Sequence, residues 1–414
     1  MTHTNLEQIA VESVATDDSS RATRKKTPGA VSRVLIGLLA TLTISLSGWA
    51  LRSWRQESVE QLHSQCRRLS AQQEWTALGR VASQWSAREP QKADPWLYLA
   101  AADEGLKDWP KVIQHLEHVP RSDKRAVAAL VRKSSIEFET LDRPWDGVHT
   151  CDEVLRLDPR VLIAHKQSIF FFAMTLQRAE MVRRIRKAIS IRRESPESYV
   201  YLVSASWLYN GSLYRHNTRW LKSGPESELF QVAQALQVYT SQAKTDPEHA
   251  AEFEHIPTAE ELLKKYPHNL ELVAYFLNRT ITEGDLDRVR ELLQAVPVEI
   301  AEKDCRFWRA KAWCDDAEGH PELAESSLRK AYSLDPYWWQ VHFQLYDLLR
   351  RQGRTEESAK FFAIYTKSKA LSTEIMTLNR SVESLDSTKF CRSMLELAEL
   401  VGDDAVATVL RERV

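Results

Sequence analysis

Two histidines one helical turn apart are the nearest approach to a catalytic or metal-binding pair in this sequence. His115 and His118 lie in the segment HLEHVP, where a helix would present both imidazoles on one face, as a metal site or an acid–base pair requires. No third ligand lies nearby, and the five cysteines form no CxxC pair. The motifs GxxxxGKS/T, GxGxxG, HExxH and GxSxG are absent. We therefore interpret the histidines as ordinary, partly exposed residues and predict a chain that is not an enzyme and holds no cofactor and no metal.

A cluster of cations is a candidate anion-binding surface. Residues 181–193 (MVRRIRKAISIRR) place aliphatic side chains at helical spacing and cover the other faces with arginine and lysine. Clustered guanidinium groups bind carboxylates and phosphates bidentately, so the surface suits an acidic peptide, a carboxylate, a lipid headgroup or nucleic acid. The alternative is a solvated helix face. The net charge of −1 argues against a nucleic-acid-binding protein. The candidate residues are Arg183, Arg184, Arg186 and Lys187.

A second candidate is the aromatic and basic segment 207–227 (WLYNGSLYRHNTRWLKSGPES). Asn-Gly and Gly-Pro turn signals enclose most of its aromatic and basic residues. Tyrosine, tryptophan and arginine are the types enriched where proteins bind one another most tightly. The alternative is a degenerate structural unit whose aromatic residues pack into the fold. The candidate contact residues are Tyr209, Tyr214, Arg215, Arg219 and Trp220.

The elements that position these residues follow from a repeat in the sequence. Gly319 and Gly353 are 34 residues apart, and the residues around them recur in the same register. A self-similarity of this period is typical of stacked helix-turn-helix units. Small and apolar residues at helical steps predict two antiparallel helices over 305–317 and 319–336. The aligned pairs are Trp308 with His342, Ala312 with Tyr346, Ala324 with Ser358, and Leu328 with Phe362.

These positions resemble the tetratricopeptide repeat family. Its pattern of an early aromatic residue, a small residue four positions on, a turn glycine and a closing proline is matched by Trp308, Ala312, Gly319 and Pro336. The resemblance covers about residues 57–370. It implies an all-α, right-handed superhelical solenoid of stacked antiparallel helix pairs whose concave groove, lined by first-helix side chains, binds peptides or proteins. The carboxylate-clamp residues known in the family cannot be placed in this sequence.

The chain departs from the pattern in informative places. Lys107 and Asp142 stand where the small turn residue is expected, and the stretch 199–267 carries extra residues. Insertions in repeat arrays map to loops that often lie on the binding face, so we predict function in this stretch. Residues 371–414 show a further helix, turn and helix, which we interpret as C-terminal capping helices.

The N-terminal region predicts a membrane anchor. Residues 34–51 (VLIGLLATLTISLSGWAL) are 18 residues without a charge, enough for a helix of about 27 Å that just spans a hydrocarbon core. The alternative is a cleaved secretory signal. Residues 1–33 are expected to form a disordered polar and basic tail. The flanking cations favour a cytoplasmic N terminus, which places the solenoid on the exported side, periplasmic in a bacterium.

The sequence thus predicts a membrane-anchored scaffold that mediates protein–protein interaction. Its expected partners are a protein or peptide of unknown identity and the membrane itself, with a homo-oligomer as a further option and no nucleic acid. Two alternatives stay open: an accessory subunit of an enzyme, or a diverged enzyme, with a site near 207–227, and a self-assembling structural component.

Overall fold

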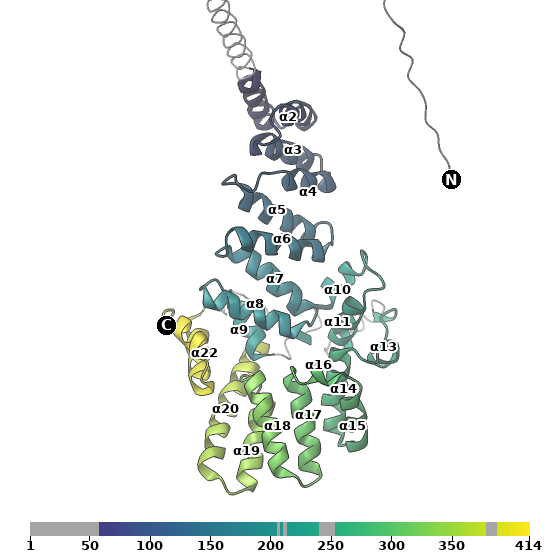
Figure 1. The fold of residues 1–414 in the computed structure, drawn as a ribbon, viewed down its shortest axis with the longest axis vertical. Coiled ribbons are helices and arrows are strands. Elements are labelled where there is room, and N and C mark those ends of the chain that lie inside the picture. Colours follow the sequence, from purple (N-terminus) through teal and green to yellow (C-terminus); the bar gives the residue numbers. More distant parts are fainter. Residues whose placement is uncertain (1–57, 205–207, 210–212, 240–252, 378–386) are drawn as a thin grey trace, which may run out of the picture. The chain divides into compact units, whose positions relative to one another are not determined.

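A computed structural model describes residues 58–204, 208–209, 213–239, 253–377 and 387–414. The chain divides into two units, residues 1–64 and 65–414, and the helices named below belong to the second. Every regular element in the described residues is helical (Figure 1). Up to residue 204 the helices are α2 (Trp75–Arg88), α3 (Ala93–Gly105), α4 (Trp109–Glu117), α5 (Ala126–Glu139), α6 (Pro144–Leu157), α7 (Leu162–Met174), α8 (Arg178–Ser190) and α9 (Pro196–Val203). After it come α10 (Tyr214–Trp220), α11 (Glu228–Tyr239), α13 (Ala259–Lys265), α14 (Leu270–Glu283), α15 (Leu286–Gln294), α16 (Val298–Ala301), α17 (Cys305–Ala317), α18 (Pro321–Leu334), α19 (Trp339–Arg351), α20 (Thr355–Thr377), α22 (Thr388–Val401) and α23 (Asp404–Arg411).

Consecutive helices pack as pairs, which confirms the predicted all-α helical repeat. The strongest packing joins α17 to α18 and α19 to α20, the two pairs predicted from the glycine spacing. Small residues let the helix backbones approach: Ala312, predicted at such a position, and Ala324, predicted in the apolar stripe of the second helix, are both buried. The pairs α3–α4, α5–α6, α7–α8 and α14–α15 pack in the same way.

The turn inside each pair has one conformation whether or not it contains glycine. Glycines at the turns have φ between 74° and 81°, in the left-handed region that side chains disfavour. The predicted replacements Lys107 and Asp142 adopt the same region, with φ of 60° and 53°. The turn geometry is therefore set by the helix pair, and these two residues accept a backbone cost that glycine avoids.

A ring nitrogen in the first helix of several pairs contacts a backbone carbonyl six residues earlier. The contacts join Trp96 to Pro90, His165 to Pro159, Trp308 to Glu302 and His342 to Pro336, each at 2.9 Å. They satisfy a carbonyl near the start of the helix and tie the incoming chain to it. The predicted alignment of Trp308 with His342 is thus confirmed as a shared role. Burial lowers the pKa of His342 to about 4, so it is neutral at physiological pH.

The region of lost register contains α9, α10, α11 and α13, and residues outside the described part of the chain lie between α9 and α10 and between α11 and α13. At the other end, α20 runs through the boundary predicted at residue 370, and α22 and α23 form the predicted final helix, turn and helix. The predicted tail 1–33 and anchor 34–51 lie outside the described residues. None of the helices that the structure describes is long and apolar enough to cross a membrane.

The turn conformation generates a prediction about single substitutions. Gly319→Ala should lower the free energy of unfolding by about 1 kcal/mol, because its Cβ has open space around it and only the left-handed backbone penalises it. Lys107→Gly should raise it by about 0.5 kcal/mol. The measurement is urea unfolding followed by circular dichroism. Gly79→Ala, in the interior of α2, is the control and should stabilise; equal shifts for both glycine substitutions would contradict the assignment.

Candidate functional site

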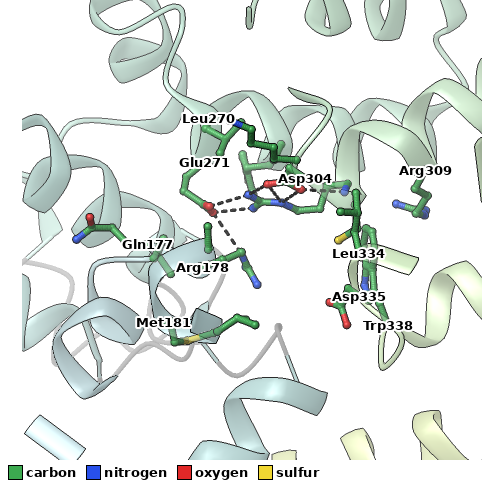
Figure 2. A pocket seen from close by; sticks show the side chains of 18 of the residues that line it. Gln177, Arg178, Met181, Leu270, Glu271, Asp304, Arg309, Leu334, Asp335 and Trp338 are labelled. Atoms are coloured by element: carbon green, nitrogen blue, oxygen red, sulfur yellow. Dashed lines mark hydrogen bonds and ion pairs between the residues drawn. The ribbon is translucent and has the colours of Figure 1, made fainter. Parts of the chain in front are cut away.

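A cavity of about 810 Å³ lies among α8, α14, α17 and the turn that follows α18 (Figure 2). This volume is within the range of sites that hold small ligands or a few side chains of a partner. Its wall contains apolar residues such as Met181 and Leu270 together with a set of charged side chains. The charged residues decide what the cavity can bind.

Several of the charged groups enter the cavity from the first turns of helices. Asn269 caps α14 by accepting hydrogen bonds from the backbone N–H groups of Glu271 and Leu272, each at 3.1 Å. Asp304 caps α17 in the same way, accepting from the N–H of Arg306 at 2.8 Å. The caps fix where each helix begins, and so where Glu271 and Arg306 project.

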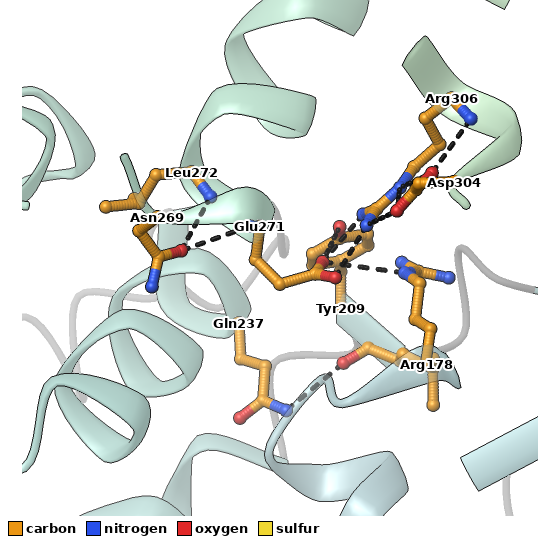
Figure 3. A network of polar contacts seen from close by, with 9 residues as sticks. Arg178, Tyr209, Gln237, Asn269, Glu271, Leu272, Asp304 and Arg306 are labelled. Carbon is orange, nitrogen blue, oxygen red and sulfur yellow. Dashed lines mark hydrogen bonds and ion pairs between the residues drawn. The ribbon is translucent and has the colours of Figure 1, made fainter. Parts of the chain in front are cut away.

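Glu271 and Arg306 form a two-pronged ion pair that links α14 to α17 (Figure 3). The guanidinium nitrogens of Arg306 donate to the two Glu271 oxygens at 2.7 and 2.6 Å, and also to Asp304 at 2.6 Å. Burial would raise the pKa of Asp304, but the Arg306 charge holds it below its usual value. Arg178, the first residue of α8, approaches Glu271 more loosely, at 3.5 Å. The network therefore joins three helices at the cavity wall.

Tyr209, from the segment of lost register, completes this network. Its hydroxyl donates to Glu271 at 3.4 Å, and the Arg178 guanidinium lies 5.4 Å from its ring centre. The preceding residue is held in place by the buried Gln237, which donates to the carbonyls of Leu208 at 3.2 Å and Met174 at 2.9 Å. The inserted segment thus reaches the cavity through Tyr209.

Arg309 differs from the other arginines of the wall because its partners are neutral. It donates to the amide oxygens of Asn278 at 3.0 Å and Gln344 at 3.1 Å, and its guanidinium lies 5.2 Å from the Trp338 ring centre. Within the described part of the chain, no carboxylate lies within ion-pair distance of Arg309, although only 8% of the residue is exposed. Burial lowers the pKa of Arg309 to about 10, so it stays protonated at neutral pH. Arg309 therefore brings to the cavity wall a buried positive charge whose contacts within the described chain are neutral.

Two further polar groups line the cavity and can accept additional hydrogen bonds. Asp335 accepts a hydrogen bond from the Tyr337 N–H at 3.0 Å, and burial raises the pKa of its carboxyl to about 6. Gln340 has a buried side-chain oxygen with no hydrogen-bond partner among the described residues. The cavity can therefore meet both donor and acceptor groups of a ligand.

The cationic cluster predicted on α8 is largely paired within the chain. Arg183 contacts Glu180, and Arg184 contacts Asp152 at 2.6 Å. Arg186 lines the cavity and pairs with Asp403, while Lys187 is exposed. Only Arg186 of this group lies at the cavity, and whether any of them binds a partner stays a prediction.

The candidates in segment 207–227 divide between cavity, core and surface. Tyr209 lines the cavity. Tyr214 and Trp220 are buried, Trp220 against Phe171 and Phe230 in an aromatic cluster. Arg219 pairs with Asp142 at 2.7 Å, and Arg215 is exposed. The structure thus brings one of the five to the cavity; their predicted contact with a partner is untested.

The histidine pair lies away from the cavity, at the end of α4. His115 approaches Asp103 at 3.0 Å, and His118 stacks on Trp96 with ring centres 4.5 Å apart. Neither residue lines the cavity. Among the described residues there is no group of three or more histidine, cysteine, aspartate or glutamate side chains placed to hold a metal ion.

The residues that make up the charged wall were not predicted from the sequence. Arg178, Glu271, Asp304, Arg306 and Arg309 were not among the candidates. The available signal was local: an asparagine or aspartate cap followed within two residues by a charged residue, as in Asn-Leu-Glu and Asp-Cys-Arg. Such pairs identify first turns, but only the fold brings them to one cavity.

No family model and no curated protein matches the chain. Solved structures similar to it include a tetratricopeptide repeat protein from Parabacteroides merdae (12% identity, 67% of this chain and 93% of that chain covered, TM-score 0.25). The C-terminal part of a TPR repeat-containing protein from Cytophaga hutchinsonii is similar at 12% identity, with a TM-score of 0.27. The match covers 66% of this chain and 95% of that chain. Yeast Tom70 is similar at 14% identity, with a TM-score of 0.25. The match covers 87% of this chain and 81% of that chain. These likenesses are too distant to carry function, and the helix-pair fold stands on the chain's own packing.

Replacing one charged residue of the cavity wall by an uncharged one should lower the stability of the fold. Glu271→Gln should lower the free energy of unfolding by about 2 kcal/mol, because it removes one of the two carboxylate charges that oppose the buried Arg306 guanidinium. Glu291→Gln, which breaks an exposed pair with Arg288, is the control and should leave stability nearly unchanged. Urea unfolding of both variants beside the original chain measures the difference. Equal stability of the two variants would show that the pair does not hold the wall together.

Proposed function

We propose that this chain is a non-catalytic scaffold whose cavity binds a segment of a partner protein through an anionic group placed against Arg309. The observation that carries the proposal is the buried Arg309 guanidinium with only neutral partners. A buried charge without a counter-charge is costly, and an incoming carboxylate relieves that cost.

The composition of the wall supports recognition of a side chain or chain end. The other two arginines deep in the wall, Arg178 and Arg306, are already opposed by Glu271 and Asp304, so they support the wall's shape. The polar groups that remain able to bind a ligand are those of Arg309, Asp335 and Gln340. A charge-assisted hydrogen bond to a buried guanidinium contributes about 1.5–3 kcal/mol, enough to select an acidic residue.

The proposal predicts that one substitution lowers partner capture while the fold is kept. Arg309→Gln should reduce the yield of partner proteins in a crosslinking pull-down from native membranes by about tenfold, the equivalent of 1.4 kcal/mol of lost binding. Glutamine leaves no orphan charge beside Asn278 and Gln344, so the fold should be retained, as circular dichroism would verify.

The matched control is Arg351→Gln, which removes an exposed arginine at the end of α19 that pairs with Asp316 of α17. It should leave capture unchanged. If Arg309→Gln retains every partner at full yield, the cavity is not the partner-binding site.

We further propose that residues 34–51 anchor the scaffold in a membrane, with the N terminus in the cytoplasm and the helix pairs on the exported side. The uncharged stretch and the cations before it support this assignment. The full chain should resist alkaline carbonate extraction from membranes, and a deletion of 34–51 should release it. A mature chain that begins after residue 51, seen by N-terminal sequencing, would replace the anchor by a cleaved signal.

A further inference from the structure

The hairpin of α19 and α20 carries an exposed group of aromatic rings on one face. We call it the α19–α20 aromatic face and define it by Trp339, Phe343, Tyr346, Phe362 and Tyr365. Ring centres lie 5.2 Å apart for Phe343 and Tyr365 and 4.9 Å apart for Tyr346 and Phe362. Phe343 and Phe362 are 43% and 47% exposed. Aromatic rings gathered in this way on a surface mark an interaction site more often than scattered apolar residues do.

The internal repeat shows what such a face contacts elsewhere in the chain. Shifting Phe343, Tyr346, Phe362 and Tyr365 back by the 34-residue period gives the corresponding residues of the α17–α18 hairpin. There the residues are Arg309, Ala312, Leu328 and Ala331, at most 8% exposed. They are covered because the next first helix, α19, packs on α18 and reaches Arg309 through Gln344. The aromatic face therefore occupies the position where, one repeat earlier, the first helix of the next pair packs.

The C-terminal helices leave this position open. Helix α22 lies beside one end of α20 (Figure 1), where Glu396 contacts Lys367 and Lys389 contacts Glu374 at 2.8 Å. Both contacts fall on the C-terminal half of α20, beyond the rings of Phe362 and Tyr365. The predicted cap thus covers α20 without covering the aromatic face.

Charge at one end of the face favours an acidic occupant. Lys369 lies 5.3 Å from the ring centres of Trp339 and Tyr365 and, within the described residues, contacts no carboxylate. At the other end, Arg350 continues the stripe of Trp339, Phe343 and Tyr346 at helical spacing, but it already pairs with Asp347 at 2.9 Å. Lys369 is therefore the cation that an acidic residue near one end of a docked helix can meet.

We propose that the α19–α20 aromatic face binds an amphipathic helix of a partner protein, seated where the first helix of another repeat would lie. The apolar stripe of that helix packs on the rings, and acidic residues near one of its ends meet Lys369. This site is separate from the cavity, so the chain offers two binding surfaces, and one does not depend on the other.

Site-specific photocrosslinking in cells that carry the full chain tests the proposal. The photoreactive residue p-benzoylphenylalanine replaces Phe343 or, separately, Phe362, and mass spectrometry identifies the attached peptide. Leu323, an exposed residue of α18, is the matched control position. We expect both test positions to attach to one helical segment of another protein that carries acidic residues near one end, with a yield about tenfold above the control.

A charge reversal and a cavity variant separate this inference from the proposed function. Lys369→Glu should lower the crosslinking yield at residue 343 several-fold, while thermal unfolding by circular dichroism stays unchanged. Arg309→Gln should leave that yield intact, whether or not the cavity binds a partner. Attachment to a second copy of this chain, attachment to lipid, or a yield no higher than that at residue 323 would each overturn the proposal.

Discussion

The ion pair between Glu271 and Arg306 is the interaction on which the cavity depends. It joins the first turns of two first helices that are 35 residues apart in sequence, and through Arg178 it reaches α8, 93 residues before Glu271. The caps Asn269 and Asp304 determine where both partners project. A buried pair of this kind adds little net stability compared with apolar packing, because desolvation offsets the attraction. Its contribution is geometric, since only one arrangement of α8, α14 and α17 satisfies the charges.

Arg309 is informative because it departs from the pairing of arginine with carboxylate seen elsewhere in the described chain. Most arginines of the described chain lie against a carboxylate, and Arg306 has two. Arg309, one turn further along α17, is held by two amides and an indole. Neutral partners fix the guanidinium in place without cancelling its charge. A cation that is held in place but not neutralised is what preorganised anion recognition requires.

The sequence predicted what is local and periodic. The spacing of Gly319 and Gly353 located α17 to α20, and the shared register of Trp308 and His342 proved to be a shared hydrogen bond. Positions whose role depends on distant partners escaped it. Glu271 and Arg306 look like ordinary first-turn charges until the fold brings them together. Trp220 shows that residue type alone can mislead. Tryptophan is favoured both at binding surfaces and in cores, and Trp220 is a core residue that is 2% exposed.

The two proposed binding surfaces share one position of the repeat. In the α17–α18 hairpin that position is Arg309, which the next helix pair covers and which lines the cavity. One period later it is Phe343, which is 43% exposed and which none of the described helix pairs covers. A repeat array buries each such position by adding the next unit, so the last regular unit must either become polar or acquire a partner. Here α22 leaves the position uncovered, and the residues there are larger and more aromatic than their buried counterparts. A unit that only ended the array would be expected to lose apolar surface at this point, whereas this one gains it.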